Sequence, residues 1–258
     1  MAFAEAEGAR IYYEQHGSGP AIMLIHGSGG HHVAWWRQVA YLAQWFTVLT
    51  IDLRGFGNST PVEGGPDSLD FVKDVEAVLD ASGVERCALL GQSIGALSAL
   101  RVAVRRPQRI AAVVLAHSLG GINDPELVDL ATADRREAEK LPVLDRLLTK
   151  EFQSGQRALT FLFRQMGTFN HAKMQDLRNL SARGPSIDEI GAAGVKVVFL
   201  CGERDCVLRS STIRRAHQKV AGSRLAVVPN GPHSLYWEMP EVFNTTVHQL
   251  LNEVYEVG

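Results

Sequence analysis

The sequence predicts an α/β protein with a mostly parallel central sheet and helices on both of its faces. Short apolar runs recur along the chain, and segments with helical periodicity separate them. Apolar runs of this length are typical of strands buried on both faces, and regular alternation of strands and helices favours parallel pairing. The predicted strands are residues 21–25, 47–51, 87–90, 110–116, 195–200 and 225–228.

The ends of the chain add a hairpin and a helix to this pattern. Residues 10–16 lead into the turn-forming stretch 17–20, so we expect a hairpin arm that runs antiparallel into the strand 21–25. The spacing of apolar residues predicts a helix over 69–82, which begins after the cap candidates Asp67 and Ser68 and ends at Gly83. Pro240 is a natural first-turn residue and predicts the start of a last helix.

Composition excludes several classes of protein. The chain has 258 residues with 26 basic and 28 acidic side chains, and this balance offers no field that would attract nucleic acid or an anionic membrane. Its first residues lack the basic and apolar pattern of a signal peptide, and no apolar run approaches the ~20 residues that span a bilayer. We therefore expect a cytoplasmic protein without membrane insertion. The sequence does not decide the oligomeric state, and a homodimer is one of the states that it allows.

The three cysteines predict no disulfide and no metal site. Cys87 and Cys201 lie in or beside strongly apolar segments, where a free cysteine behaves as a small hydrophobic residue. Together with Cys206 they are odd in number. We interpret them as thiols in a reducing compartment.

The alternation of strands and helices breaks between about residues 123 and 186. This region has no strand-like run, and its acidic and basic residues stand among scattered Leu, Phe and Met. It follows the strand 110–116, at the edge where parallel strands end and where α/β sheets bind ligands. A helical insertion is therefore predicted, either as a lid over a site or as a decoration.

A nucleophile is predicted in the segment Gly91-Gln92-Ser93-Ile94-Gly95. It follows the strand 87–90 directly and continues into a helix-forming run that stops at Pro107. In a strand-turn-helix of this kind the serine needs strained backbone angles, and the glycines let the neighbouring backbones pass closely. The hydroxyl of Ser93 would then stand at the carboxyl edge of the sheet.

A second serine has a similar setting and is rejected. Ser118 also follows a strand, within Ala116-His117-Ser118-Leu119-Gly120. The residues after it, up to Pro125, cannot start a helix at once, so Ser118 would lack a helix N-terminus and rigid support.

A serine nucleophile needs a histidine base that is held by a carboxylate. His233 lies in the loop between the strand 225–228 and the last helix, and Asp205 follows the strand 195–200, so both are predicted at the same edge as Ser93. His217 and His248 are interpreted as solvated helix residues, and His16 belongs to the hairpin arm. Glu203 and Asp124 are the reserve carboxylates.

The loop His26-Gly27-Ser28-Gly29-Gly30 offers backbone N–H groups to an anion. One hypothesis is an oxyanion hole formed by the amides of Ser28 and Ile94. The other is a dinucleotide site with Asp52 as the ribose-binding acid, but His32 stands where the third glycine of that motif belongs. A metal at His26, His31 and His32 is disfavoured, because no carboxylate or cysteine at ligand spacing accompanies them.

Taken together, these motifs resemble the α/β-hydrolase superfamily over essentially the whole chain. The resemblance rests on the loop from His26, on residues 52–59 with the pattern D-x-R-G-x-G-x-S, on the Ser93 turn, on the Asp205 loop and on Pro232-His233-Ser234. It implies the α/β-hydrolase fold with a helical cap inserted after the sixth strand. The core would comprise residues 1–122 and 187–258, and the cap residues 123–186. In that family the 52–59 stretch is a structural turn, so Asp52 is kept out of the site.

The predicted activity is acyl transfer to water without a cofactor. Ser93, His233 and Asp205 would cleave a small or medium apolar carboxylic ester, and Ser28 and Ile94 would bind the oxyanion. The alternative is a carbon–carbon hydrolase of ring-cleavage diketones, whose members often carry an aromatic residue where Ser234 follows the histidine here. A third alternative is a ligand receptor or a cofactor-free oxygenase. Aromatic residues are candidates for the pocket: Trp35, Trp36, Phe161, Phe163 and Trp237.

Overall fold

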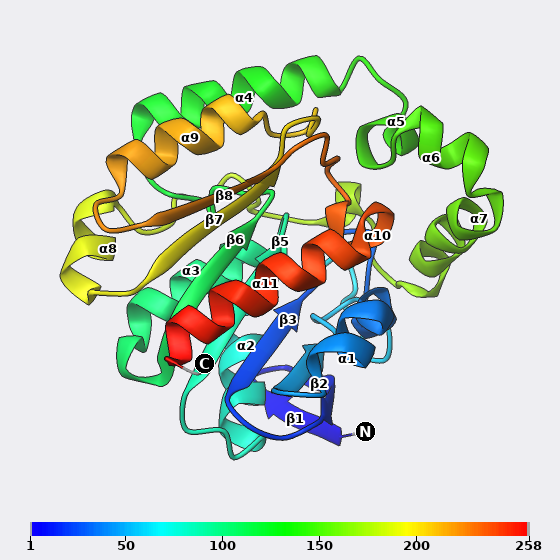
Figure 1. Cartoon of the computed structure of the whole chain (residues 1–258). Helices are drawn as coiled ribbons and strands as arrows, with labels where there is room; N and C mark the ends of the chain where they lie inside the picture. The colour runs from blue at the N-terminus through cyan, green and yellow to red at the C-terminus, as the bar shows by residue number, and fades with distance from the viewer. Residues whose placement is uncertain (1, 257–258) are drawn as a thin grey trace.

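The computed structural model of the chain, which describes residues 2–256, contains one sheet of eight strands in the order β1-β2-β4-β3-β5-β6-β7-β8 (Figure 1). The strands are β1 (Ala2–Ala6), β2 (Ala9–His16), β3 (Ala21–Ile25), β4 (Thr47–Ile51), β5 (Cys87–Gln92), β6 (Ile110–Ala116), β7 (Val197–Gly202) and β8 (Arg224–Val228). Strands β3 to β8 run parallel to one another, whereas β2 pairs antiparallel with both β1 and β4. The predicted fold class is confirmed.

The predicted partner of residues 10–16 is wrong. Strand β2 lies antiparallel to β4, with Tyr13 opposite Ile51, and β3 lies on the far side of β4. The sequence does not distinguish these two positions, because β3 and β4 are equally apolar and a turn can lead the chain to either. Strand β1, which the sequence analysis did not predict, completes the hairpin with β2.

Helices cover both faces of the sheet, as predicted. Helices α2 and α3 lie on one face, and α1 and α11 lie on the other (Figure 1). Side chains alternate between the two cores along each strand, so in β3 Met23 and Ile25 contact one core while Ile22 and Leu24 contact the other. The helices are α1 (Trp36–Leu42), α2 (Phe71–Ala81), α3 (Gly95–Arg105), α9 (Ser210–Lys219), α10 (Leu235–Glu238) and α11 (Pro240–Tyr255).

The segment between β6 and β7 is helical. It contains α4 (Pro125–Ala138), α5 (Val143–Leu147), α6 (Lys150–Gly155), α7 (Arg157–Met166) and α8 (Ile187–Ala193). Helix α4 is fixed to the core, because Asp134 accepts hydrogen bonds from the Thr212 hydroxyl at 2.7 Å and the Arg209 amide at 3.0 Å. Helices α5 to α7 form a separate group beyond the sheet (Figure 1). The cap boundaries at residues 123 and 186, and the role of a lid, stay predictions.

Two further sequence features can be compared with the structure. Cys87 and Cys201 are buried and Cys206 is half-buried, and all three are free thiols. Within residues 2–256, no helix combines the length and the apolar composition that crossing a bilayer requires.

A buried ion pair fixes the turn after β4 to helix α2. The carboxylate of Asp74 accepts the Arg54 backbone N–H at 2.9 Å and the Arg54 Nε–H at 2.8 Å, and both side chains are buried. Burial raises the pKa of Asp74, and the hydrogen bonds from Arg54 oppose that rise.

We expect Asp74→Ala to lower the free energy of unfolding by about 3–5 kcal/mol, because it removes the buried partner of Arg54 and leaves only the half-buried Asp70 at 3.5 Å. Urea unfolding measures this loss. Asp80→Ala is the control, since Asp80 pairs with Arg106 and Arg109 at the surface, and it should cost less than about 1 kcal/mol. Equal losses in the two variants would contradict this account of the turn.

Candidate active site

Ser93 lies on a strained turn between β5 and α3. It has a φ of 52°, a conformation that residues with a side chain rarely adopt. A Cβ atom on Gly95 would lie 2.5 Å from the carbonyl oxygen of Ile25, and one on Gly91 would lie 2.5 Å from the Ala96 Cα. Only glycine therefore fits at either side of this turn. The turn holds the half-buried Ser93 at the carboxyl edge of the sheet, beside the N-terminus of α3.

Asp205 and His233 form a buried hydrogen-bonded pair at the same edge. The Nδ1 atom of His233 lies 2.9 Å from Asp205 Oδ2 and 3.0 Å from Oδ1. Asp205 Oδ1 also accepts the backbone N–H groups of Val207 at 2.8 Å and Leu208 at 3.1 Å. The loop after β7 therefore orients the carboxylate, and the carboxylate orients the imidazole. Within residues 2–256 no hydrogen bond joins the Ser93 hydroxyl to His233, so the contact between nucleophile and base stays a prediction.

A second histidine, which the sequence analysis missed, binds the same carboxylate. His117 follows β6 directly, and its Nδ1 lies 2.9 Å from Asp205 Oδ2. The two imidazole rings lie 5.5 Å apart between centroids. The sequence offered one signal for this residue, its place at the end of a predicted strand on the catalytic edge.

The electrostatics of this cluster favour an ionised Asp205. Burial alone would raise the pKa of its carboxyl group, but the electrostatic interaction with His233 and the hydrogen bonds from both histidines hold the pKa well below its usual range. Burial lowers the pKa of His117, although its contact with Asp205 opposes that shift. An ionised carboxylate can only accept hydrogen bonds, so each imidazole must present its Nδ1–H to Asp205.

The other carboxylates and histidines have different roles. Asp124 caps α4 by accepting a hydrogen bond from the Leu127 backbone N–H, and it accepts a second one from Lys219 Nζ at 2.7 Å. Glu203 is exposed. His217 and His248 are half-buried rather than solvated, because His217 bonds the Ser223 hydroxyl and His248 packs against Trp45. The exposed His16 bonds Glu14.

Ser118 does not lie on a nucleophile turn. Its hydroxyl accepts the Gly120 amide at 3.1 Å, and the next helix, α4, begins only at Pro125. This geometry agrees with its rejection on sequence grounds.

The loop after β3 that carries Ser28 is held by a network of buried hydrogen bonds. His26 Nδ1 lies 2.8 Å from the Gly27 carbonyl, and its Nε2 accepts the Leu53 amide at 3.1 Å. Burial lowers the pKa of His26 to about 4, so the ring is neutral and can serve both contacts. This loop lies against the nucleophile turn, because a Cβ atom added to Gly27 would be 3.4 Å from the Ser93 Cβ.

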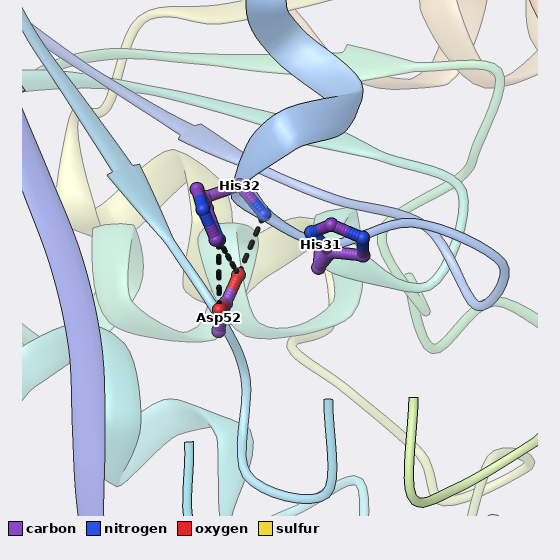
Figure 2. Close-up of side chains that lie close together, drawn as sticks. All are labelled: His31, His32 and Asp52. Atoms are coloured by element: carbon purple, nitrogen blue, oxygen red, sulfur yellow. Dashed lines mark hydrogen bonds and ion pairs between the residues drawn. The ribbon is translucent and has the colours of Figure 1, made fainter. Parts of the chain in front are cut away.

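Figure 2 shows how His32 and Asp52 complete this network. The backbone N–H and the Nδ1 of His32 lie 2.5 and 2.9 Å from Asp52 Oδ1, and the Asn58 amide donates to Asp52 Oδ2 at 2.8 Å. Burial alone would raise the pKa of Asp52, but the contact with His32 keeps it below the usual range.

The premise that no carboxylate accompanies the histidines is wrong, because possible ligand atoms of His31, His32 and Asp52 lie within 4.8 Å of one another. The hydrogen bonds of Asp52 nevertheless account for its carboxylate as a structural group. The carboxylate is fully buried, and both of its oxygens accept hydrogen bonds. His31 lies beside the pair but turns its Nδ1 to the Val33 amide. Asp52 therefore joins the β3 loop to the turn after β4, as expected for a structural residue.

A cavity of about 470 Å³ is lined by Ser93 and Ile94, whereas the other predicted site residues, Asp205, His233 and Ser28, do not line it. Ser93, Ile94, His117 and Ser118 line it at the sheet edge. The remaining lining residues come from α3, α4, residues 119 and 121–123, Met174, and residues 180–183 and 207–208. The aliphatic side chains among its lining residues are Leu97, Leu119, Ile122, Leu127, Val128, Leu180, Val207 and Leu208.

The aromatic residues named as pocket candidates do not line this cavity. Trp35 and Trp237 are buried in the core beside α11, where Phe163 packs edge-on against Trp237. Phe161 and Trp36 are exposed at the surface. Their spacing in the sequence could not separate a core or surface position from a pocket.

Comparisons with known proteins agree with the fold described above. The family described as alpha/beta hydrolase fold matches residues 20–240. A relative from Azorhizobium caulinodans, provisionally named a carbamate hydrolase, is 33% identical over 115 residues, which are 45% of this chain and 43% of that protein.

Two solved structures share the fold over 98% of both chains. One is a thermophilic esterase from Thermogutta terrifontis with malate bound, at 22% identity and a TM-score of 0.81. The other is a meta-cleavage product hydrolase from Pseudomonas fluorescens IP01, at 20% identity and a TM-score of 0.78. The chain therefore belongs to the alpha/beta hydrolase family, as its motifs predict.

Proposed function

We propose that the protein is a serine hydrolase that cleaves a small or medium apolar carboxylic ester through an acyl-enzyme. The observation that carries this proposal is the buried Asp205–His233 pair on the edge where the strained Ser93 turn ends. Membership of a hydrolase family supports the same reaction class.

The reaction proceeds in two half-reactions. Ser93 Oγ attacks the ester carbonyl carbon while His233 Nε2 takes the hydroxyl proton, and the tetrahedral intermediate then expels the alcohol, which leaves with that proton. A water molecule repeats the sequence on the acyl-enzyme and releases the acid. Asp205 stays ionised throughout, since it holds the imidazole and stabilises its positive charge.

The oxyanion of each intermediate is bound by the backbone N–H groups of Ser28 and Ile94. The Ile94 amide precedes α3, where the first N–H groups of a helix have no partner within the helix. The Ser28 loop is rigid through the His32–Asp52 contact and through Asn170, whose side chain donates to the Gly30 carbonyl at 3.2 Å.

The cavity beside Ser93 supports a substrate of modest size. Its volume of about 470 Å³ and its many aliphatic side chains suit an apolar acyl or alcohol group. The near-zero net charge of the chain fits a substrate that needs no electrostatic steering.

A carbamate is the second candidate substrate, because the relative from Azorhizobium caulinodans is provisionally named a carbamate hydrolase. The same acyl transfer would apply to its carbonyl. A panel of aryl esters, aryl carbamates and ring-cleavage diketones, compared by kcat/KM, separates these reactions from carbon–carbon hydrolysis.

Replacing the nucleophile tests the proposal. We expect Ser93→Ala to reduce turnover of a short-chain chromogenic ester by several powers of ten, because the acyl-enzyme cannot form. A phosphonate that labels activated serine should modify Ser93 in the wild-type protein, as read by peptide mass spectrometry. Ser118→Ala is the control and should retain most of the turnover. Label on Ser118, or full turnover in Ser93→Ala, would refute the assignment.

Replacing the base tests which histidine accepts the proton. His233→Asn should lose several powers of ten in kcat while it keeps its melting temperature within a few degrees. His217→Asn, a change of a half-buried histidine on α9, should leave kcat unchanged. If His233→Asn retained wild-type kcat, His233 would not be the base.

A further inference from the structure

His117 has one ring nitrogen that the described structure does not use. Its Nδ1 is bound to Asp205, whereas its Nε2 is buried and has no hydrogen-bond partner within the described part of the chain. His117 is one of the residues that line the cavity that Ser93 also lines, but its side chain has no exposed surface, so a ligand reaches Nε2 only when the cavity wall shifts. A buried polar atom without a partner is costly, and such an atom beside a catalytic cavity points to a ligand.

The chemistry of this free nitrogen follows from its neighbour. Because Asp205 is an acceptor only, the Nδ1 of His117 carries the proton that forms their hydrogen bond. Burial keeps the ring neutral, and in a neutral imidazole the second nitrogen is then an acceptor with a free lone pair. The free nitrogen of His117, buried behind the cavity wall, is therefore an acceptor and not a donor.

We propose that His117 is a specificity residue whose Nε2 accepts a hydrogen bond from a hydroxyl or N–H group of the substrate. The inference rests on the proposed hydrolase function and names a feature of its substrate. An otherwise apolar ester with a donor group near the scissile carbonyl would bind better than the same ester with a methyl group in that position.

The backbone at His117 agrees with a specific role. The residue has a φ of 56°, so the chain leaves β6 in a left-handed conformation that is unfavourable for a residue with a side chain. His117 and His233 share one carboxylate, and both Nδ1 atoms point to it. A metal ion between Asp205 and the two imidazoles would have to displace the hydrogen bonds that both Nδ1 atoms make with the carboxylate. A substrate donor at Nε2 leaves these bonds in place.

The test compares matched esters on the wild-type protein. Two pairs of chromogenic esters are needed, one with a hydroxyl or a methyl on the acyl chain and one with the same exchange on the alcohol side. We expect the hydroxyl ester of at least one pair to have a kcat/KM about tenfold higher, mainly through KM. Equal kcat/KM values within both pairs would overturn the inference without any need for a variant.

His117→Asn then tests the residue itself. Asparagine tolerates a positive φ, and its short amide can still donate to Asp205, but it has no acceptor at the position of Nε2. The preference for the hydroxyl ester should fall to about one in this variant. Ser118→Ala, which changes the adjacent cavity-lining hydroxyl, should keep the wild-type preference.

The outcomes separate this inference from the proposed function. An unchanged preference in His117→Asn, or its loss in Ser118→Ala alone, would overturn the role of His117 while ester hydrolysis by Ser93 stands. Full turnover of all four esters in Ser93→Ala would instead refute the hydrolase mechanism itself.

Discussion

The candidate site depends on one buried carboxylate. Asp205 accepts hydrogen bonds from two imidazoles and two backbone amides, so a charge that would be costly to bury unpaired is fully coordinated by the protein. These contacts keep its pKa low. They also fix the loops after β6, β7 and β8 relative to one another, because each loop contributes a group to the carboxylate. Removing the carboxylate would therefore disturb the orientation of His233 and His117 together.

The order of the strands explains why these groups meet. Ser93, His117, Asp205 and His233 follow β5, β6, β7 and β8, which are four consecutive neighbours in the sheet. The Ser28 loop follows β3, the neighbour of β5 on the other side. Parallel strands place all of these loops on one edge. The His32–Asp52 and Arg54–Asp74 contacts hold the loops after β3 and β4, which are the neighbouring part of the sheet.

Sequence reasoning reached the fold and the predicted site through local signals. Buried strands had continuous apolar runs, and the Ser93 turn had a glycine on each side for a reason that the structure bears out, since neither position has room for a Cβ. Other features had no local signal. The pairing of β2 depends on whether β3 or β4, two similarly apolar strands, lies next to it. The core positions of Trp35 and Trp237 depend on packing between helices that are distant in the sequence. No local signal indicates that His117 shares the carboxylate that His233 binds, because a serine nucleophile calls for only one histidine base.

The claim that Asp205 holds both imidazoles through Nδ1–H is open to direct measurement. Long-range ¹H–¹⁵N spectra of protein with labelled histidine report which ring nitrogen carries the proton, and the His117→Asn and His233→Asn variants assign the two signals. The account predicts that at neutral pH His117 is neutral with its proton on Nδ1, and that His233 also carries a proton on Nδ1. A proton on Nε2 of a neutral His117, with Nδ1 bare, would contradict both the geometry at Asp205 and the acceptor role inferred for His117.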